Sequence, residues 1–199
     1  MYTEPSGNDS WIVILAGPSG SGKSTIGKML SEKLSCSFID ADRYHKNSAK
    51  KQMSQKIPVD DTYRQAWIER LLGALVTKNE DGENVVLACS CLKRFIRKRF
   101  LSELSEYASS QIMIVWLDVS ANALANRLNK RQGHFFPKEL LPSQLDAMEV
   151  PTENELGLLR INCLGKTSDM IADEIIMRLP LSSDISGVEA FGDSLFMLE

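Results

Sequence analysis

One short stretch of the sequence has the residue types and the spacing that bind phosphate. It reads Gly17-Pro18-Ser19-Gly20-Ser21-Gly22-Lys23-Ser24-Thr25 and fits the pattern G-x-x-x-x-G-K-S/T. Glycines let the backbone curl so that successive N–H groups point at phosphate oxygens, and a following helix adds the positive end of its dipole. Lys23 is suited to bridge the outer phosphates of a nucleotide, and the Ser24 hydroxyl is suited to ligate Mg²⁺. We therefore predict that this segment binds the phosphates of ATP.

Two carboxylates come next along the chain. Asp40 and Asp42 end the run Ser37–Asp42, which we predict to be a short strand. Side chains two positions apart share a face of a strand, so one carboxylate can hold the water ligands of Mg²⁺ while the other accepts the proton of a substrate hydroxyl. The alternative is an Asx turn that caps the next helix. His45 follows, either as a hydrogen-bond partner for a polyol or as a surface residue or helix cap.

Cationic side chains gather in two later segments. Lys93, Arg94 and Arg97 lie within one turn of a predicted helix and can clamp an anionic substrate together. Arg127 and Arg131 share a helix face, from which they can reach ATP phosphates and stabilise the transferring charge. For both groups the alternative is a solvated helix face.

Strands that alternate with helices must position these residues. Apolar, β-branched-rich runs at 11–16, 85–89, 112–117 and 158–163 predict buried strands, and segments with helical spacing separate them. This alternation predicts an α/β fold with a parallel sheet that is covered on both faces. Ligands bind at the carboxyl ends of strands in such sheets, where the glycine loop and both aspartates would lie.

The remaining segments have less regular patterns. Residues 132–155 hold three prolines and many polar side chains, which is typical of a mobile lid. Residues 1–10 read as a flexible leader and residues 180–199 as a C-terminal tail. We therefore expect a single P-loop kinase domain over residues 11–179.

Composition and missing motifs exclude several classes of protein. The net charge of −3 argues against binding to nucleic acid, and no apolar run approaches the roughly 20 residues that span a bilayer. The four cysteines lack zinc-site spacing, and the first ten residues lack the features of a signal peptide, so we expect a cytoplasmic protein. The guanine-reading pattern N-K-x-D is incomplete at residues 129–132, and no acidic pair follows residues 85–89 as in motor ATPases. A small-molecule kinase is what remains.

Five blocks of sequence resemble the gluconokinases over roughly residues 11–179. They are Gly17–Thr25; Phe38-Ile39-Asp40-Ala41-Asp42 with His45; Ile57-Pro58-Val59-Asp60-Asp61 with Arg64 and Trp67; Ala88-Cys89-Ser90-Cys91-Leu92-Lys93; and Arg131-Gln132-Gly133-His134-Phe135-Phe136-Pro137. The resemblance implies ATP-dependent phosphorylation of D-gluconate at its 6-hydroxyl. It also implies a fold like that of adenylate and other nucleoside-monophosphate kinases, and a homodimer.

The resemblance further implies a role for each matching residue. Asp40 would support Mg²⁺ together with Ser24, and Asp42 would orient or deprotonate the hydroxyl. The catalytic cations would be Lys23, Arg127 and Arg131. The residues that bind the sugar acid would be Asp42, His45, Arg64, Lys93, Arg97 and His134. The chain departs from the family at Cys91, at Ile96-Arg97-Lys98 and at Leu145. Two alternatives therefore stay open: a related kinase for another small hydroxy acid, and a nucleotide-binding regulatory protein that has lost catalysis.

Overall fold

The computed structural model describes residues 10–55, 57, 59–107, 111–130, 138–152 and 154–179. The predicted leader, except Ser10, and the predicted tail lie outside these residues. So do Arg131 and His134, two of the predicted site residues.

A five-stranded parallel sheet forms the centre of the molecule. Its order is β2 (Ser37–Asp40), β3 (Val85–Ala88), β1 (Trp11–Ala16), β4 (Gln111–Asp118) and β5 (Leu158–Asn162). Every neighbouring pair is parallel. Strand β1 is buried along its whole length because all six of its residues are apolar and it lies between β3 and β4. The predicted parallel sheet is confirmed.

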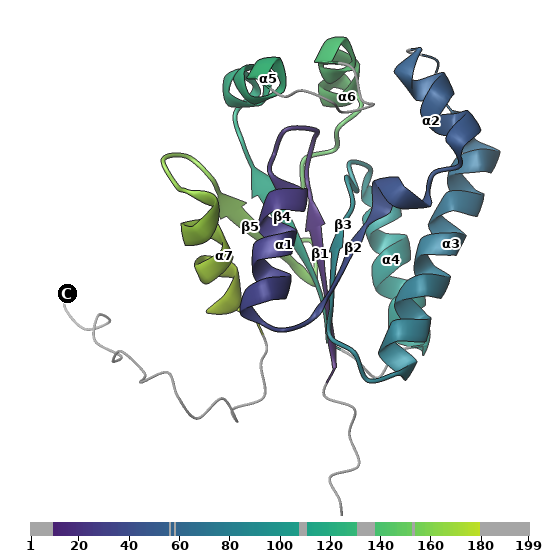
Figure 1. Cartoon of the computed structure of the whole chain (residues 1–199), viewed down its shortest axis with the longest axis vertical. Helices are drawn as coiled ribbons and strands as arrows, with labels where there is room; N and C mark the ends of the chain where they lie inside the picture. The colour runs from purple at the N-terminus through teal and green to yellow at the C-terminus, as the bar shows by residue number, and fades with distance from the viewer. Residues whose placement is uncertain are drawn as a thin grey trace, which may run out of the picture.

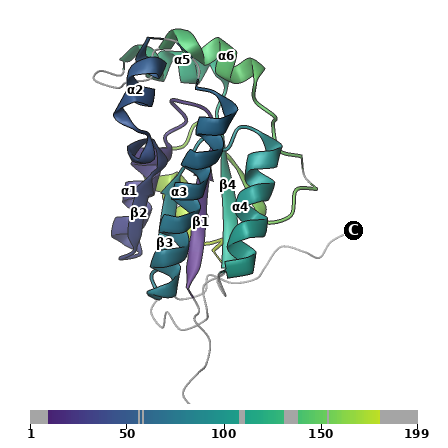
Figure 2. The ribbon, with the colours of Figure 1, turned by 90° about the vertical axis from the view of Figure 1, so that its right-hand side faces the viewer.

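Helices cover both faces of the sheet (Figures 1 and 2). Helices α1 (Lys23–Lys33) and α7 (Ser168–Ile176) cover one face, and α3 (Asp61–Glu80) and α4 (Arg94–Tyr107) cover the other. Side chains alternate across β1, so that Ile14 belongs to the core beneath α3 and α4 while Leu15 belongs to the core beneath α1 and α7. This double layer holds the carboxyl ends of the strands in a fixed arrangement.

Short helices lie beyond the carboxyl ends of the strands (Figure 1). They are η1 (Ala41–Tyr44), α2 (Asn47–Ser54), α5 (Ala121–Lys130), η2 (Lys138–Leu140) and α6 (Leu141–Asp146). Leu124 and Leu128 of α5 form a small core with Leu141 of α6. Part of the predicted lid is therefore helical and packs on α5. None of the helices in the described ranges is long and apolar enough to cross a membrane.

The end of the second strand differs from the sequence prediction. We expected the strand to run to Asp42, but β2 ends at Asp40 and the chain turns into the 3-10 helix η1. The turn forms because the Asp40 carboxylate accepts a hydrogen bond from the backbone N–H of Asp42 at 3.0 Å. The prediction that both aspartates share one face of a strand was therefore wrong.

Candidate functional site

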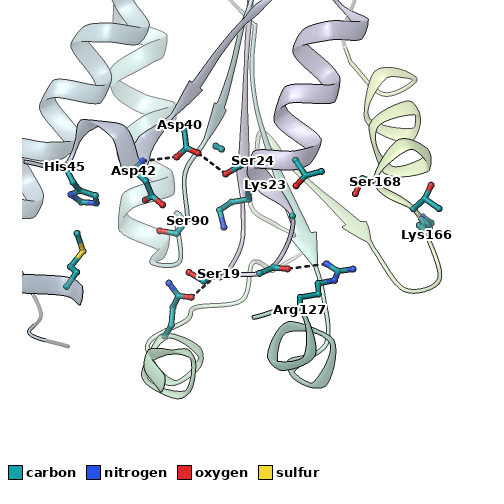
Figure 3. A pocket seen from close by; sticks show the side chains of 17 residues that line it. Ser19, Lys23, Ser24, Asp40, Asp42, His45, Ser90, Arg127, Lys166 and Ser168 are labelled. Carbon is teal, nitrogen blue, oxygen red and sulfur yellow. Dashed lines mark hydrogen bonds between the residues drawn. The ribbon is translucent and has the colours of Figure 1, made fainter. Parts of the chain in front are cut away.

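A cavity of about 590 Å³ opens at the carboxyl ends of the strands. Residues from the glycine loop, the end of β2, the loop after β3, α5, α6 and the loop before α7 line it. Figure 3 shows Lys23 in the middle of this cavity, with Asp42 and His45 to one side and Lys166 and Ser168 to the other. The cavity lies at the edge of the sheet where the sequence predicted the chemistry.

The glycine loop has the curled backbone that its sequence predicts. Gly22, the N-cap of α1, has φ 103°, a left-handed conformation that favours glycine. Gly17 has φ 136°, and a Cβ there would come 3.2 Å from the carbonyl oxygen of Leu117. A side chain at either position would strain the backbone of the loop.

Lys23 is held by the loop itself. Its Nζ donates to the carbonyl oxygens of Gly17 at 2.8 Å and Pro18 at 2.9 Å. The pKa of Lys23 is lower than usual because burial disfavours the charged ammonium. The carboxylates of Asp42 and Asp40 oppose this effect but do not cancel it. The ammonium group thus lies beside the cavity with its position set before any phosphate arrives.

The two aspartates approach the loop from the end of β2. The Ser24 hydroxyl donates to Oδ2 of Asp40 at 2.9 Å, while Oδ1 of Asp40 accepts from the Asp42 N–H. Asp40 therefore caps the turn, as in the Asx-turn alternative, and also contacts Ser24 of the phosphate loop. Asp42 lines the cavity near Lys23.

A hydroxyl beside a carboxylate fits Mg²⁺. These are hard oxygen ligands, and Mg²⁺ in kinases commonly binds one or two protein oxygens and completes its shell with water and phosphate. The described ranges contain no group of three or more His, Cys, Asp or Glu side chains that could hold a metal ion. Ser24 and Asp40 thus match a metal that takes few ligands from the protein.

His45 lies in an aromatic stack at the wall of the cavity. Its ring is parallel to that of Trp67, with centroids 4.5 Å apart, and stacks on Tyr63 at 5.8 Å. Burial lowers the pKa of His45 to about 4, helped by the positive charges of Lys50 and Arg70. The imidazole is therefore neutral at physiological pH.

Arg127 reaches the loop from α5. Its Nη1 donates to the carbonyl oxygens of Gly20 and Ser21, each at 3.3 Å, and its side chain lines the cavity. Arg131, predicted to act beside Arg127, and His134, predicted to bind the sugar acid, lie outside the described residues.

Three residues predicted to bind the sugar acid are not among the described residues that line this cavity. Lys93 is paired with Glu149, at 3.2 Å, and Arg64 lies in the first turn of α3. Arg97 is 1% exposed, and its guanidinium faces into the protein, where it binds both carboxylate oxygens of Glu155 at 2.8 and 2.9 Å. It also donates to the carbonyl oxygens of Cys91 and Leu92. In this arrangement Arg97 supports the loop after β3, because its donors are already taken inside the protein.

The site residues predicted from the sequence do not include several residues that line the cavity. Lys166, Thr167 and Ser168 come from the loop between β5 and α7, Ser90 from the loop after β3, and Gln144 from α6. Oε1 of Gln144 accepts a hydrogen bond from the backbone N–H of Ser19 at 2.7 Å, which links the segment predicted as a lid to the phosphate loop. One signal could have found the first group, because the carboxyl end of a fifth parallel strand must lie at the same edge.

The four cysteines are free thiols, and Cys89, Cys91 and Cys163 are buried. A hydrogen bond with Cys89, together with burial, raises the pKa of the Cys91 thiol well above its usual value. Cys89 and Cys91 pack in the core beneath α3 and α4, and Cys163 packs in the core beneath α1 and α7.

Several known proteins are similar to this chain in sequence and in structure. Residues 12–151 match the family model described as an AAA domain. The chain is 40% identical over 146 residues to a gluconokinase of Arabidopsis thaliana, covering 69% of this chain and 77% of the relative. It is 37% identical over 149 residues to the thermosensitive gluconokinase of Escherichia coli strain K12, covering 75% and 77%. A solved structure of a gluconokinase from Sinorhizobium meliloti 1021 superposes with a TM-score of 0.70 at 30% identity, covering 85% of this chain and 90% of that one.

Proposed function

Because the chain belongs to the gluconokinase family, we propose that it transfers the γ-phosphoryl group of ATP to the 6-hydroxyl of D-gluconate. The products are 6-phospho-D-gluconate and ADP. The observation that carries this proposal is the juxtaposition of Lys23 in the phosphate loop with Asp42 and His45 in one cavity. A phosphate donor and a polyol acceptor can meet there.

The protein's contribution to the reaction is mainly positioning and charge. The loop amides and Lys23 hold the phosphates, and Arg127 lies where it can stabilise charge on the transferring group. Asp42 accepts the proton of the 6-hydroxyl as that oxygen bonds to the γ-phosphorus and the bond to the ADP oxygen breaks. Ser24 and Asp40 would hold Mg²⁺, directly or through its water ligands, and the ion would supply positive charge to the phosphates.

We assign the acid substrate to the side of the cavity that Asp42 and His45 line. Lys166, Thr167 and Ser168 line the opposite side, which leaves that side for the nucleoside part of ATP. Arg64, Lys93, Arg97 and His134 stay predictions as ligands of the acid. For Arg97 such a role would require a rearrangement that frees its guanidinium from Glu155.

Other parts of the proposal come from the sequence. Residues 11–179 form the kinase domain, and residues 132–155 act as a lid that excludes water from the closed site. The hydrogen bond between Gln144 and Ser19 supports the proposal of a lid, because it joins α6 to the phosphate loop. A homodimer and a cytoplasmic location stay predictions.

A kinase assay over a panel of acids, with identification of the products by mass spectrometry and NMR, tests the activity. D-gluconate should give the highest kcat/KM and a 6-phosphorylated product, and Lys23→Met should abolish turnover in the same preparation. Higher kcat/KM with another hydroxy acid would favour the related-kinase alternative. ATP binding without transfer to any acid would favour a regulatory protein.

A further inference from the structure

The Tyr63 hydroxyl joins two separate segments next to the cavity. Its oxygen accepts a hydrogen bond from the backbone N–H of Lys46 at 2.9 Å. The same oxygen lies 3.2 Å from Nδ1 of His45. Tyr63 belongs to the first turn of α3, where the Asp60 carboxylate caps the helix by accepting the Tyr63 N–H at 2.7 Å. The cap therefore fixes the backbone from which the phenol extends.

The Tyr63 hydroxyl can accept one hydrogen bond, from Lys46, and donate another, to His45. The Lys46 N–H is a donor only, so the Tyr63 oxygen must act as acceptor in that bond. The phenolic hydrogen is then available for Nδ1 of His45. Arg70 lies over the Tyr63 ring, 5.8 Å from its centroid, so a cation–π contact helps to hold the ring in place. If Nδ1 accepts, the hydrogen of the neutral imidazole is on Nε2.

The ring cannot easily turn to exchange its two nitrogens. Trp67 stacks on it with an angle of 4° between the planes, and the Trp67 indole N–H is itself anchored to the carbonyl oxygen of Ala41 at 3.1 Å. Trp67 is buried. The imidazole is thus held in its plane by the indole and oriented within that plane by the phenol.

We propose that Tyr63 is a positioning residue that holds neutral His45 in the Nε2–H tautomer, so that His45 offers an N–H donor to an oxygen of the acid substrate. The identity of that substrate rests on the proposed function, whereas the tautomer does not. His45 lines the cavity, and its Nδ1 edge is engaged by Tyr63, which leaves Nε2 for the ligand. A neutral N–H donor suits a hydroxyl oxygen of a polyol as well as a carboxylate.

Nitrogen-15 NMR of the full chain tests the tautomer directly. The chain has two histidines, so His134→Gln assigns the signals of His45. We expect wild-type His45 to show a protonated Nε2 and an unprotonated Nδ1 between pH 6 and pH 8. A protonated Nδ1, or an imidazolium in this range, would overturn the proposal without reference to any kinase activity.

Two conservative variants test the role of Tyr63. Tyr63→Phe keeps the ring but removes the hydroxyl, and Tyr44→Phe removes a phenolic hydroxyl from η1 as the matched control. Tyr63→Phe should produce a mixture of His45 tautomers and weaken equilibrium binding of gluconate by about 3–10-fold, as expected for one hydrogen bond. Tyr44→Phe should leave the tautomer as in the wild type. Wild-type tautomer signals in Tyr63→Phe, or unchanged gluconate binding, would overturn the positioning role.

Failure of the proposed function has a different signature. If the wild-type protein neither bound nor phosphorylated gluconate while its His45 showed the Nε2–H tautomer, the assignment of the substrate would be wrong and the tautomer would stand. If Tyr63→Phe failed to fold, the wild-type NMR measurement would still decide the tautomer.

Discussion

The Ser24 hydroxyl lies 2.9 Å from Oδ2 of Asp40, so the first turn of α1 contacts the end of β2 through these two oxygen atoms. Asp40 is fixed in this position because its other oxygen accepts the N–H of Asp42. The contact connects the phosphate loop to the acidic turn that follows the second strand.

Asp40→Asn should raise the Mg²⁺ concentration needed for half-maximal activity by about 10–100-fold, since an amide is a weaker partner for the ion and its water ligands. Mg²⁺ titrations at saturating ATP and gluconate measure the change. Asp81→Asn, at the C-cap of α3, is the control and should behave like the wild type. An unchanged Mg²⁺ requirement in Asp40→Asn would contradict the assigned metal site.

Asp42→Asn should lower kcat by about 10²–10⁴, the usual contribution of a positioned acid–base group. The Kd for ATP should change little, because the predicted phosphate ligands are those of the loop. Steady-state kinetics and equilibrium nucleotide binding separate the two effects. A near-normal kcat in this variant would show that Asp42 is not the base.

Gln144→Ala should speed amide hydrogen exchange at Ser19 in the ligand-free protein by about 3–10-fold, because it removes the acceptor of that N–H. Mass spectrometry of peptides from the phosphate loop measures the exchange. Ser143→Ala, on the same helix, serves as the control. Equal exchange in the wild type and Gln144→Ala would show that α6 does not protect the loop.

Glu155→Ala should reduce the free energy of unfolding by about 3–5 kcal/mol, because it leaves the buried guanidinium of Arg97 without its counter-ion. Glu103→Ala removes the partner of Arg99 in a more exposed pair on α4 and should cost only about 0–1 kcal/mol. Urea denaturation of both variants gives the comparison. Similar losses in the two variants would argue against a structural role specific to Arg97.

The depressed pKa of His45 predicts a pH dependence of stability. The folded state binds the proton only near pH 4, whereas the unfolded state binds it near 6.5, so protons favour unfolding between these values. The free energy of unfolding should therefore fall as the pH drops from 6.5 towards 4, and this effect should be absent above about pH 7.

His45→Gln should make the pH dependence shallower, since glutamine does not titrate. Urea denaturation at intervals between pH 4.5 and pH 7.5 measures it in both proteins. Identical slopes in the wild type and the variant would mean that another group dominates this range.

The parts of the site that follow one another closely along the chain were predictable from the sequence. A phosphate loop needs a buried strand before it and a helix after it, and residues 11–34 carry all three patterns. The parallel sheet followed from near-continuous apolar strands separated by helices, and its carboxyl edge then located Asp40 and Asp42 together with the loop.

Other features depended on contacts between distant segments. The sequence placed Arg97 in a basic cluster at the rim, but a guanidinium turns inward when a carboxylate and two carbonyl oxygens are available inside, and Glu155 lies 58 positions away. Likewise, nothing in the spacing of His45 and Tyr63 shows that the phenol meets Nδ1, because that requires α3 to pack beside η1. Local pattern determined which chemistry the chain can carry, while tertiary packing decided which charges are neutralised inside and which groups reach the cavity, since both depend on partners that the linear order does not bring together.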